Sequence, residues 1–236
     1  MDKQRLIDIT TIWGQILDAT RKGSEPKGEM GELIGRYHDA VTRYLKLKLR
    51  DQNLADEVAQ EFWTKLLAGK LAGADPSKGR FRDYLRTVLH RLIIDHFRGR
   101  KVQQLPTGDL LDPSSTDEEF DHVWRETVIK RVILRLKTFE ATTPNNRYAT
   151  VLSLRTDYPD AAIEELASKL SAQINANVKA EAFRKSLERA RKKFTELLVE
   201  ELRETIDPAT QEDIEAEMND LGLGNVYKRY FEQHAV

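Results

Sequence analysis

The sequence predicts an all-α protein: two small helical domains joined by an acidic linker, the second containing a helix-turn-helix. Three observations support this. Apolar residues recur at three- and four-residue spacing along most of the chain, with no convincing two-residue alternation. Residues 102–121 break this pattern and carry Pro, Gly, Ser and acidic residues, which is typical of a linker. In the second half, a short apolar helix, a break and a longer basic helix follow one another.

The first domain, residues 1–101, is expected to contain helices at 4–20, 30–50, 53–68 and about 80–99. Gly69, Gly73 and Pro76 separate the last two. The fourth helix has an apolar stripe wide enough to pack on a core. Its members are Phe81, Tyr84, Leu85, Val88, Leu89, Leu92 and Ile93.

The second domain, residues 122–204, follows the linker 102–121. Helices are expected at about 120–139, 146–156, 161–171 and 178–204, and Asp160 is expected to cap the third of them. Residues 205–236 form an acidic C-terminal extension whose apolar end, 222–236, is expected to dock as a short helix.

The net charge of −1 conceals a segregated charge pattern. Residues 80–101 hold seven Lys/Arg and two Asp, and residues 178–194 hold seven Lys/Arg and two Glu, so each block carries +5. Residues 105–121 carry −6 and residues 196–220 carry −9. Two basic blocks predict two docking places for a polyanion, although each alone would also fit a solvated helix face.

Composition excludes several classes of protein. The chain has no run of about 18 apolar residues, as a membrane span needs, and charges interrupt its first residues where a signal peptide is apolar. It has no cysteine, hence no disulfide. Neither a phosphate-binding glycine loop, nor HExxH, nor a nucleophile elbow occurs. We expect a cytoplasmic, non-enzymatic protein with no cofactor and no metal site.

One face of the predicted helix 53–68 gathers acidic and amide side chains, opposite its apolar stripe. A docking face for a basic partner helix is the functional interpretation, and ordinary solvated surface is the alternative. The residues are Asp56, Glu57, Gln60 and Glu61.

The helix at 80–99 has the opposite character. Arg82, Arg86, His90 and Arg91 are expected to lie off its apolar stripe, where they could neutralise phosphates. Tyr84 is the aromatic residue best suited to stack on an unpaired base, because its hydroxyl favours a half-exposed position. The candidate DNA-binding set is Arg80, Arg82, Tyr84, Arg86, His90, Arg91, Arg98, Arg100 and Lys101.

The helix at 178–204 is expected to bury Ala182 or Phe183, Leu187, Ala190 and Phe194. Its other face would present long basic donors toward a major groove, as a recognition helix requires. These candidates are Lys179, Arg184, Lys185, Arg189, Arg191, Lys192 and Lys193.

The first domain resembles region two of the bacterial sigma factors of the extracytoplasmic-function type. The resemblance is carried first by Ala55, Asp56, Glu57, Val58, Gln60, Glu61 and Phe62, and then by Phe81, Leu85, Asp95, His96, Arg98 and Arg100. It implies that the acidic helix docks on the β′ clamp helices of core RNA polymerase and that the basic helix melts the minus-ten element. Tyr84 stands where the family usually has Trp, and Arg91 where Asn is common, which leaves the minus-ten preference open.

The second domain resembles sigma region four, which implies contact with the minus-thirty-five element and the polymerase β flap. The resemblance rests on Arg147, Leu152 and Leu154, and on Arg189, Ala190, Arg191, Lys192, Lys193 and Phe194. The turn around 171–181 is longer than the family's, and no region-three domain is present. The resemblance thus predicts a sigma factor that binds core polymerase and promoter DNA, with no membrane partner.

Several alternatives remain open from the sequence alone. The runner-up is a helix-turn-helix regulator that never meets polymerase; the face of residues 56–61 is the feature that discriminates against it. The third alternative is a helical adaptor that binds no nucleic acid. An anti-sigma partner is neither predicted nor excluded. We also expect the acidic extension to cover a basic surface of its own domain.

Overall fold

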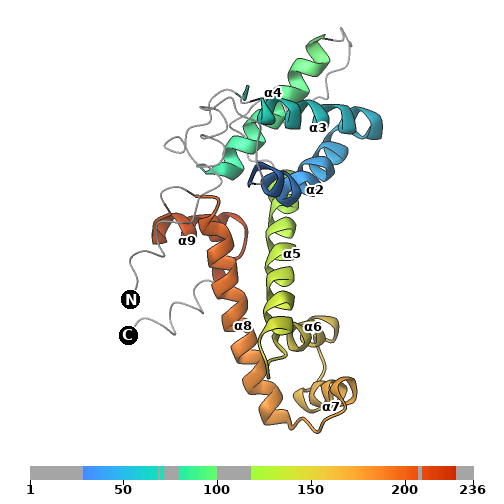
Figure 1. The fold of residues 1–236 in the computed structure, drawn as a ribbon, viewed down its shortest axis with the longest axis vertical. Helices are drawn as coiled ribbons and strands as arrows, with labels where there is room; N and C mark the ends of the chain where they lie inside the picture. Colours follow the sequence, from blue (N-terminus) through green and yellow to red (C-terminus); the bar gives the residue numbers. More distant parts are fainter. Residues whose placement is uncertain (1–28, 69, 72–79, 100–117, 207–208, 227–236) are drawn as a thin grey trace. The chain divides into compact units, whose positions relative to one another are not determined.

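A computed structural model describes residues 29–68, 70–71, 80–99, 118–206 and 209–226. Within these ranges every regular element is a helix, which confirms the all-α class (Figure 1). The helices are α2 (Glu29–Leu49), α3 (Gln52–Leu67), α4 (Phe81–Gly99), α5 (Glu118–Thr142), α6 (Tyr148–Asp157), α7 (Ile163–Ile174), α8 (Ala180–Arg203) and α9 (Gln211–Asp220).

Predicted and observed helices agree to within about three residues for α2 to α8. The predicted helix 4–20 and most of the linker lie outside the described residues. Residues 118–121, placed in the linker by the sequence, form the first turn of α5. Asp160 does not cap α7: Ala162 occupies the N-cap position, and no side chain bonds to it there.

The chain divides into two compact units: one contains residues 1–127 and 202–217, the other 128–201 and 218–236. The division differs from the predicted boundaries, because it falls inside α5 and returns residues 202–217 to the first unit. The reason is visible in burial: Leu202, Thr205, Ile206 and Ile214 are all buried, although they follow the predicted second domain or lie at its end.

The core of the first unit is built from α2, α3, α4 and the start of α5. The rings of Tyr37 and Trp124 stack with centroids 5.0 Å apart and planes 5° apart, and Phe81 packs on both. Helix α3 begins where the Asp51 carboxylate accepts a hydrogen bond from the Leu54 amide at 3.0 Å. This cap satisfies one of the backbone donors at the start of the helix.

In the second unit, α6, α7 and α8 share one apolar cluster, consisting of Val151, Leu154, Leu166, Ala167, Leu170, Phe183 and Leu187. Figure 1 shows α6 and α7 beside one end of α8. Helix α7 ends at Asn175, whose left-handed backbone (φ 51°) turns the chain. The Ser171 hydroxyl then accepts a hydrogen bond from the Val178 amide at 2.9 Å, which ties the turn to α7.

Helix α9 was not predicted. Its start is a capping box: the Asp213 amide donates to the Thr210 hydroxyl oxygen, and the Thr210 amide donates to the Asp213 carboxylate, both at 3.2 Å. The apolar end of the extension was expected to form a helix instead. Residues 224–226 are helical, and the rest of that segment lies outside the described residues.

Candidate nucleic-acid interface and partner surfaces

Helix α3 turns its apolar residues inward and its carboxylates outward. Its buried face comprises Ala55, Val58, Ala59, Phe62, Trp63 and Leu66. Asp56, Glu57 and Gln60 are exposed, and Glu61 is half-exposed, so the four predicted docking residues share one accessible face. Asp56 accepts a hydrogen bond from Gln52 at 2.7 Å, and Glu61 pairs with Lys65 at 2.6 Å. Such exposed pairs are weak and leave the carboxylates available to a partner.

Helix α4 buries more of its charge than the sequence predicts. The expectation that Arg82 and His90 lie off the buried face is wrong, because they are only 4% and 0% exposed. His90 contacts the Tyr44 hydroxyl, with Nε2 2.6 Å from the oxygen. A histidine and an arginine can lie in a core when each finds polar partners there, and both do so here.

The partners of Arg82 come from segments far away in the sequence. Its Nη1 donates to Asp121 of α5 at 2.5 Å, and its Nε lies 3.1 Å from Glu217 of α9. Arg80, just before α4, donates to the same Glu217 at 2.6 Å. Burial raises the pKa of the Glu217 carboxyl, and the two arginines oppose that shift.

The other predicted α4 residues differ in exposure. Arg86 pairs with Asp83 at 3.4 Å, and its side chain is only 12% exposed. Arg91 and Arg98 are exposed. Tyr84 is half-buried, and burial raises the pKa of its hydroxyl to about 12 against the opposing charge of Arg91, so it is a neutral phenol at physiological pH. Arg100 and Lys101 lie outside the described residues.

Helix α8 presents a basic face opposite the apolar cluster. Phe183, not Ala182, is its buried residue near the start, and Leu187 and Ala190 follow it inward. The exposed cations are Lys179 just before the helix, then Arg184, Lys185, Arg189, Arg191 and Lys192. Lys193 is half-buried: it pairs with Glu196 at 3.1 Å and lies over the Phe139 ring, 5.0 Å from its centroid.

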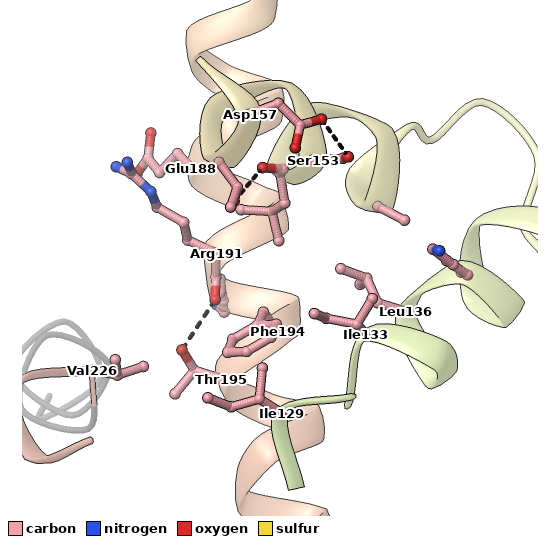
Figure 2. Close-up of a pocket in the computed structure, with 15 residues that line it drawn as sticks. Ile129, Ile133, Leu136, Ser153, Asp157, Glu188, Arg191, Phe194, Thr195 and Val226 are labelled. Carbon is pink, nitrogen blue, oxygen red and sulfur yellow. Dashed lines mark hydrogen bonds between the residues drawn. The ribbon is translucent and has the colours of Figure 1, made fainter. Parts of the chain in front are cut away.

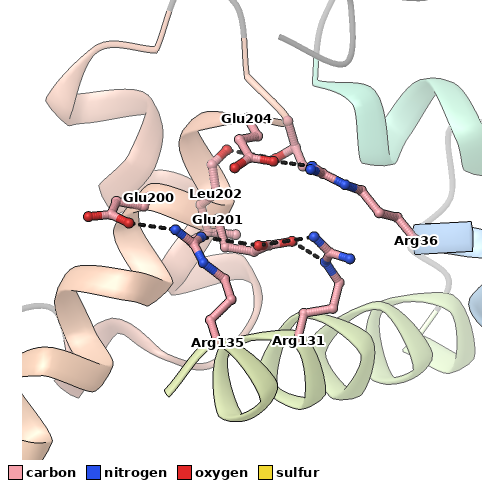
Figure 3. A network of polar contacts seen from close by, with 8 residues as sticks. Arg36, Arg131, Arg135, Glu200, Glu201, Leu202 and Glu204 are labelled. Atoms are coloured by element: carbon pink, nitrogen blue, oxygen red, sulfur yellow. Dashed lines mark hydrogen bonds and ion pairs between the residues drawn. The ribbon is translucent and has the colours of Figure 1, made fainter. Parts of the chain in front are cut away.

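A polar network fixes α5 against α8 in the second unit. Arg131 and Arg135, one turn apart on α5, both reach the Glu201 carboxylate, which is 1% exposed (Figure 3). Arg135 also donates to Glu200 at 2.6 Å. A buried carboxylate with two arginine partners fixes how the helices pair, because losing either partner would leave it less well compensated.

A cavity of about 600 Å³ lies in the same unit, lined by residues of α5, α6 and α8. Ile129, Ile133 and Phe194 form an apolar part, and Asp157 and Arg191 stand at its margin (Figure 2). Ile133 is 41% exposed, and the neighbouring Leu134 is 65% exposed. The sequence pattern placed Phe194 in the core, but it is only half-buried. Exposed apolar side chains next to a cavity are typical of a surface that receives a partner.

Features of two other protein classes are absent from the described residues. None of their helices is both long and apolar enough to cross a membrane. In the same ranges, no group of three or more His, Asp or Glu side chains could hold a metal ion.

Residues 33–102 match the family model of sigma-70 region 2, which covers most of α2, all of α3 and α4, and less than a third of the chain. The chain therefore contains a sigma-70 region 2 domain. Such a domain implies a sigma factor: a non-enzymatic, DNA-binding transcription-initiation protein that binds core RNA polymerase and recognises the promoter minus-ten element. No curated protein and no solved structure matches the chain.

Proposed function

We propose that the chain is a sigma factor of the extracytoplasmic-function type, with a region-two domain (1–101), a linker (102–121) and a region-four helix-turn-helix domain (122–204). The observation that carries this proposal is the combination of the region 2 match with a second, independently packed basic helix. Helices α6, α7 and α8 share one apolar cluster, and α8 keeps its cations outside it.

The carboxylate face of α3 is proposed to dock on the β′ clamp helices of core polymerase. Three of its four side chains are exposed and the fourth is half-exposed, while the apolar face beneath them is fully engaged in the core. A partner would therefore meet charge and amide groups on a rigid helix. Complementary charge of this kind steers association and fixes register more than it adds affinity.

Minus-ten recognition is proposed to rest on Tyr84, Arg91 and Arg98, together with Arg100 and Lys101. Arg91 and Arg98 are exposed, and Tyr84 is half-exposed. Four other candidates are assigned structural contacts in the free protein, because their side chains are paired or buried within the domain. They are Arg80, Arg82, Arg86 and His90.

The exposed cations of α8 are proposed to contact minus-thirty-five DNA. Arg184, Lys185 and Arg189 are spaced one and four residues apart, so they lie along the outward side of the helix, away from Phe183 and Leu187. Lys193 is less suited to base contact, since Glu196 and the Phe139 ring already hold it.

The cavity beside Ile133 is proposed to receive an apolar helix of the polymerase β flap. Ile133 and Leu134 are exposed on α5, and the cavity wall is apolar with charged margins. An amphipathic helix could bury its apolar side in this cavity and keep its polar side in solvent. A chain that binds polymerase in this way would work in the cytoplasm.

The alternative is a helix-turn-helix regulator that does not bind core polymerase. The α3 face favours the polymerase partner over this alternative, because its exposed carboxylates and amide are suited to docking on a basic helix. Run-off transcription with purified core polymerase tests the proposal. We expect promoter-dependent transcripts only when the chain is added, and a core that stays inactive with it would contradict the proposal.

A further inference from the structure

The last residues of α8 and the segment after it return to the start of α4. Residues 202–217 belong to the same unit as α2, α3 and α4. The Phe81 amide donates to the Thr205 carbonyl at 3.2 Å, and Leu202, Thr205, Ile206 and Ile214 are buried. The segment is therefore docked on the region 2 domain, not on the helix-turn-helix domain that precedes it in sequence.

Two carboxylates of this segment neutralise three arginines of the region 2 domain. Glu204 pairs with Arg36 of α2 (Figure 3), and Glu217 pairs with both Arg80 and Arg82. Glu217 is 1% exposed, so its contact with the arginines is shielded from water and salt. These acidic side chains therefore occupy arginines that the phosphates of a nucleic acid could otherwise contact.

The charge of the whole segment supports a role beyond packing. Residues 202–217 hold six acidic residues and a single base, Arg203, whereas residues 80–101 carry +5. The buried residues of α9 are Ile214, Glu217 and Met218. The surplus carboxylates include the exposed Glu212, and they would repel DNA from the same edge of the domain.

We propose that residues 202–206 and 209–217 form an intramolecular acidic cover that holds Arg80 and Arg82 away from promoter DNA until the single-stranded minus-ten region displaces it. The proposal rests on the proposed function, because it takes region 2 to be a DNA-binding surface. It also changes the task of the extension: the charge pattern predicted that the extension covers its own domain, whereas the surface covered belongs to the first. Phosphates would replace the Glu217 carboxylate as the partners of the two arginines.

The test uses the full chain and compares Glu217→Lys with Glu212→Lys. Both substitutions add the same charge to α9, but Glu212 is exposed and Glu217 is buried against the arginines. Binding of each variant to a single-stranded minus-ten oligonucleotide is measured by fluorescence anisotropy. We expect Glu217→Lys to bind about tenfold more tightly than Glu212→Lys, the size expected when charge contacts are released. Equal affinities of two folded variants would overturn the proposal.

Hydrogen exchange on the unaltered protein gives a second, mutation-free measurement, and it decides the matter if Glu217→Lys loses helicity. We expect α9 amides to be protected in the free chain and to exchange faster once the oligonucleotide is bound. Unchanged protection of the α9 amides in the DNA complex would overturn the proposal that DNA displaces this segment. Failure of the unaltered protein to initiate transcription with core polymerase would refute the sigma-factor assignment instead, so the two failures are distinguishable.

Discussion

The hydroxyl oxygen of Tyr44 lies 2.6 Å from Nε2 of His90, and neither side chain has any exposed surface. This contact joins α2 to α4 in the interior of the region 2 domain. It changes the interpretation of His90, which the sequence pattern had placed with the DNA-contacting cations.

Replacing His90 by Ala should destabilise the protein by about 1–3 kcal/mol, because the Tyr44 hydroxyl would be left in the core without this partner. Urea unfolding followed by circular dichroism measures the change. The exposed neighbour Arg91, changed to Ala, serves as the control and should shift stability by no more than about 0.5 kcal/mol. A His90→Ala protein of full stability that has lost only DNA binding would restore the original interpretation.

Removing exposed charge from α4 should weaken DNA binding without affecting the fold. The double variant Arg91→Ala, Arg98→Ala is expected to bind a minus-ten oligonucleotide less tightly and with a shallower salt dependence. The slope of log affinity against log salt should fall by about one for each phosphate that the variant no longer neutralises. Titrations at several salt concentrations measure this slope, and an unchanged slope would exclude both arginines from phosphate binding.

The basic face of α8 gives a parallel prediction for double-stranded DNA. Changing Arg184 and Lys185 to Ala should lower affinity for promoter duplex, since both side chains are exposed on the outward face. The matched control changes Lys130 and Lys137 of α5 to Ala, which removes the same charge from another helix. If both double variants lose affinity equally, the effect is one of net charge and α8 has no special role.

The buried carboxyl of Glu217 predicts a pH dependence of stability. Burial raises its pKa, against Arg82 and Arg80 and with a smaller contribution from the negative charge of Asp83. A carboxyl whose folded pKa is raised stabilises the fold fully below its ordinary pKa and loses that contribution as pH rises through the folded pKa. The stability difference between the natural protein and Glu217→Gln should therefore shrink as pH rises through this window.

Urea unfolding of both proteins at a series of pH values measures that difference. A difference that instead grows with pH would mean that attraction to the two arginines outweighs the cost of burying the carboxylate.

Local sequence patterns predicted much of the fold. The apolar stripes of α2 to α8 recur at helical spacing, and so their existence and approximate bounds followed from the residues alone. The exposed positions of Asp56, Glu57 and Gln60 followed in the same way, since they lie opposite the stripe that contains Val58 and Phe62.

Local sequence patterns could not predict which charged side chains would be exposed and which would be paired. Arg80 and its partner Glu217 are 137 residues apart, so nothing near α4 indicated that Arg80 would be paired. Helix α9, by contrast, does have a local signal in the sequence: Thr210 and Asp213 form a capping box ahead of Ile214 and Met218, which have helical spacing.

Glu61 tests the central claim most directly, because its side chain is half-exposed and its pair with Lys65 is worth only a few tenths of a kcal/mol. Run-off transcription with core polymerase compares the natural protein with Glu61→Lys and with Glu118→Lys, a control that makes the same charge change at an exposed position of α5. We predict transcripts from the natural protein and from Glu118→Lys, and a severe loss with Glu61→Lys. Full activity of Glu61→Lys would contradict the assigned polymerase interface, and no activity from any of the three would contradict the account as a whole.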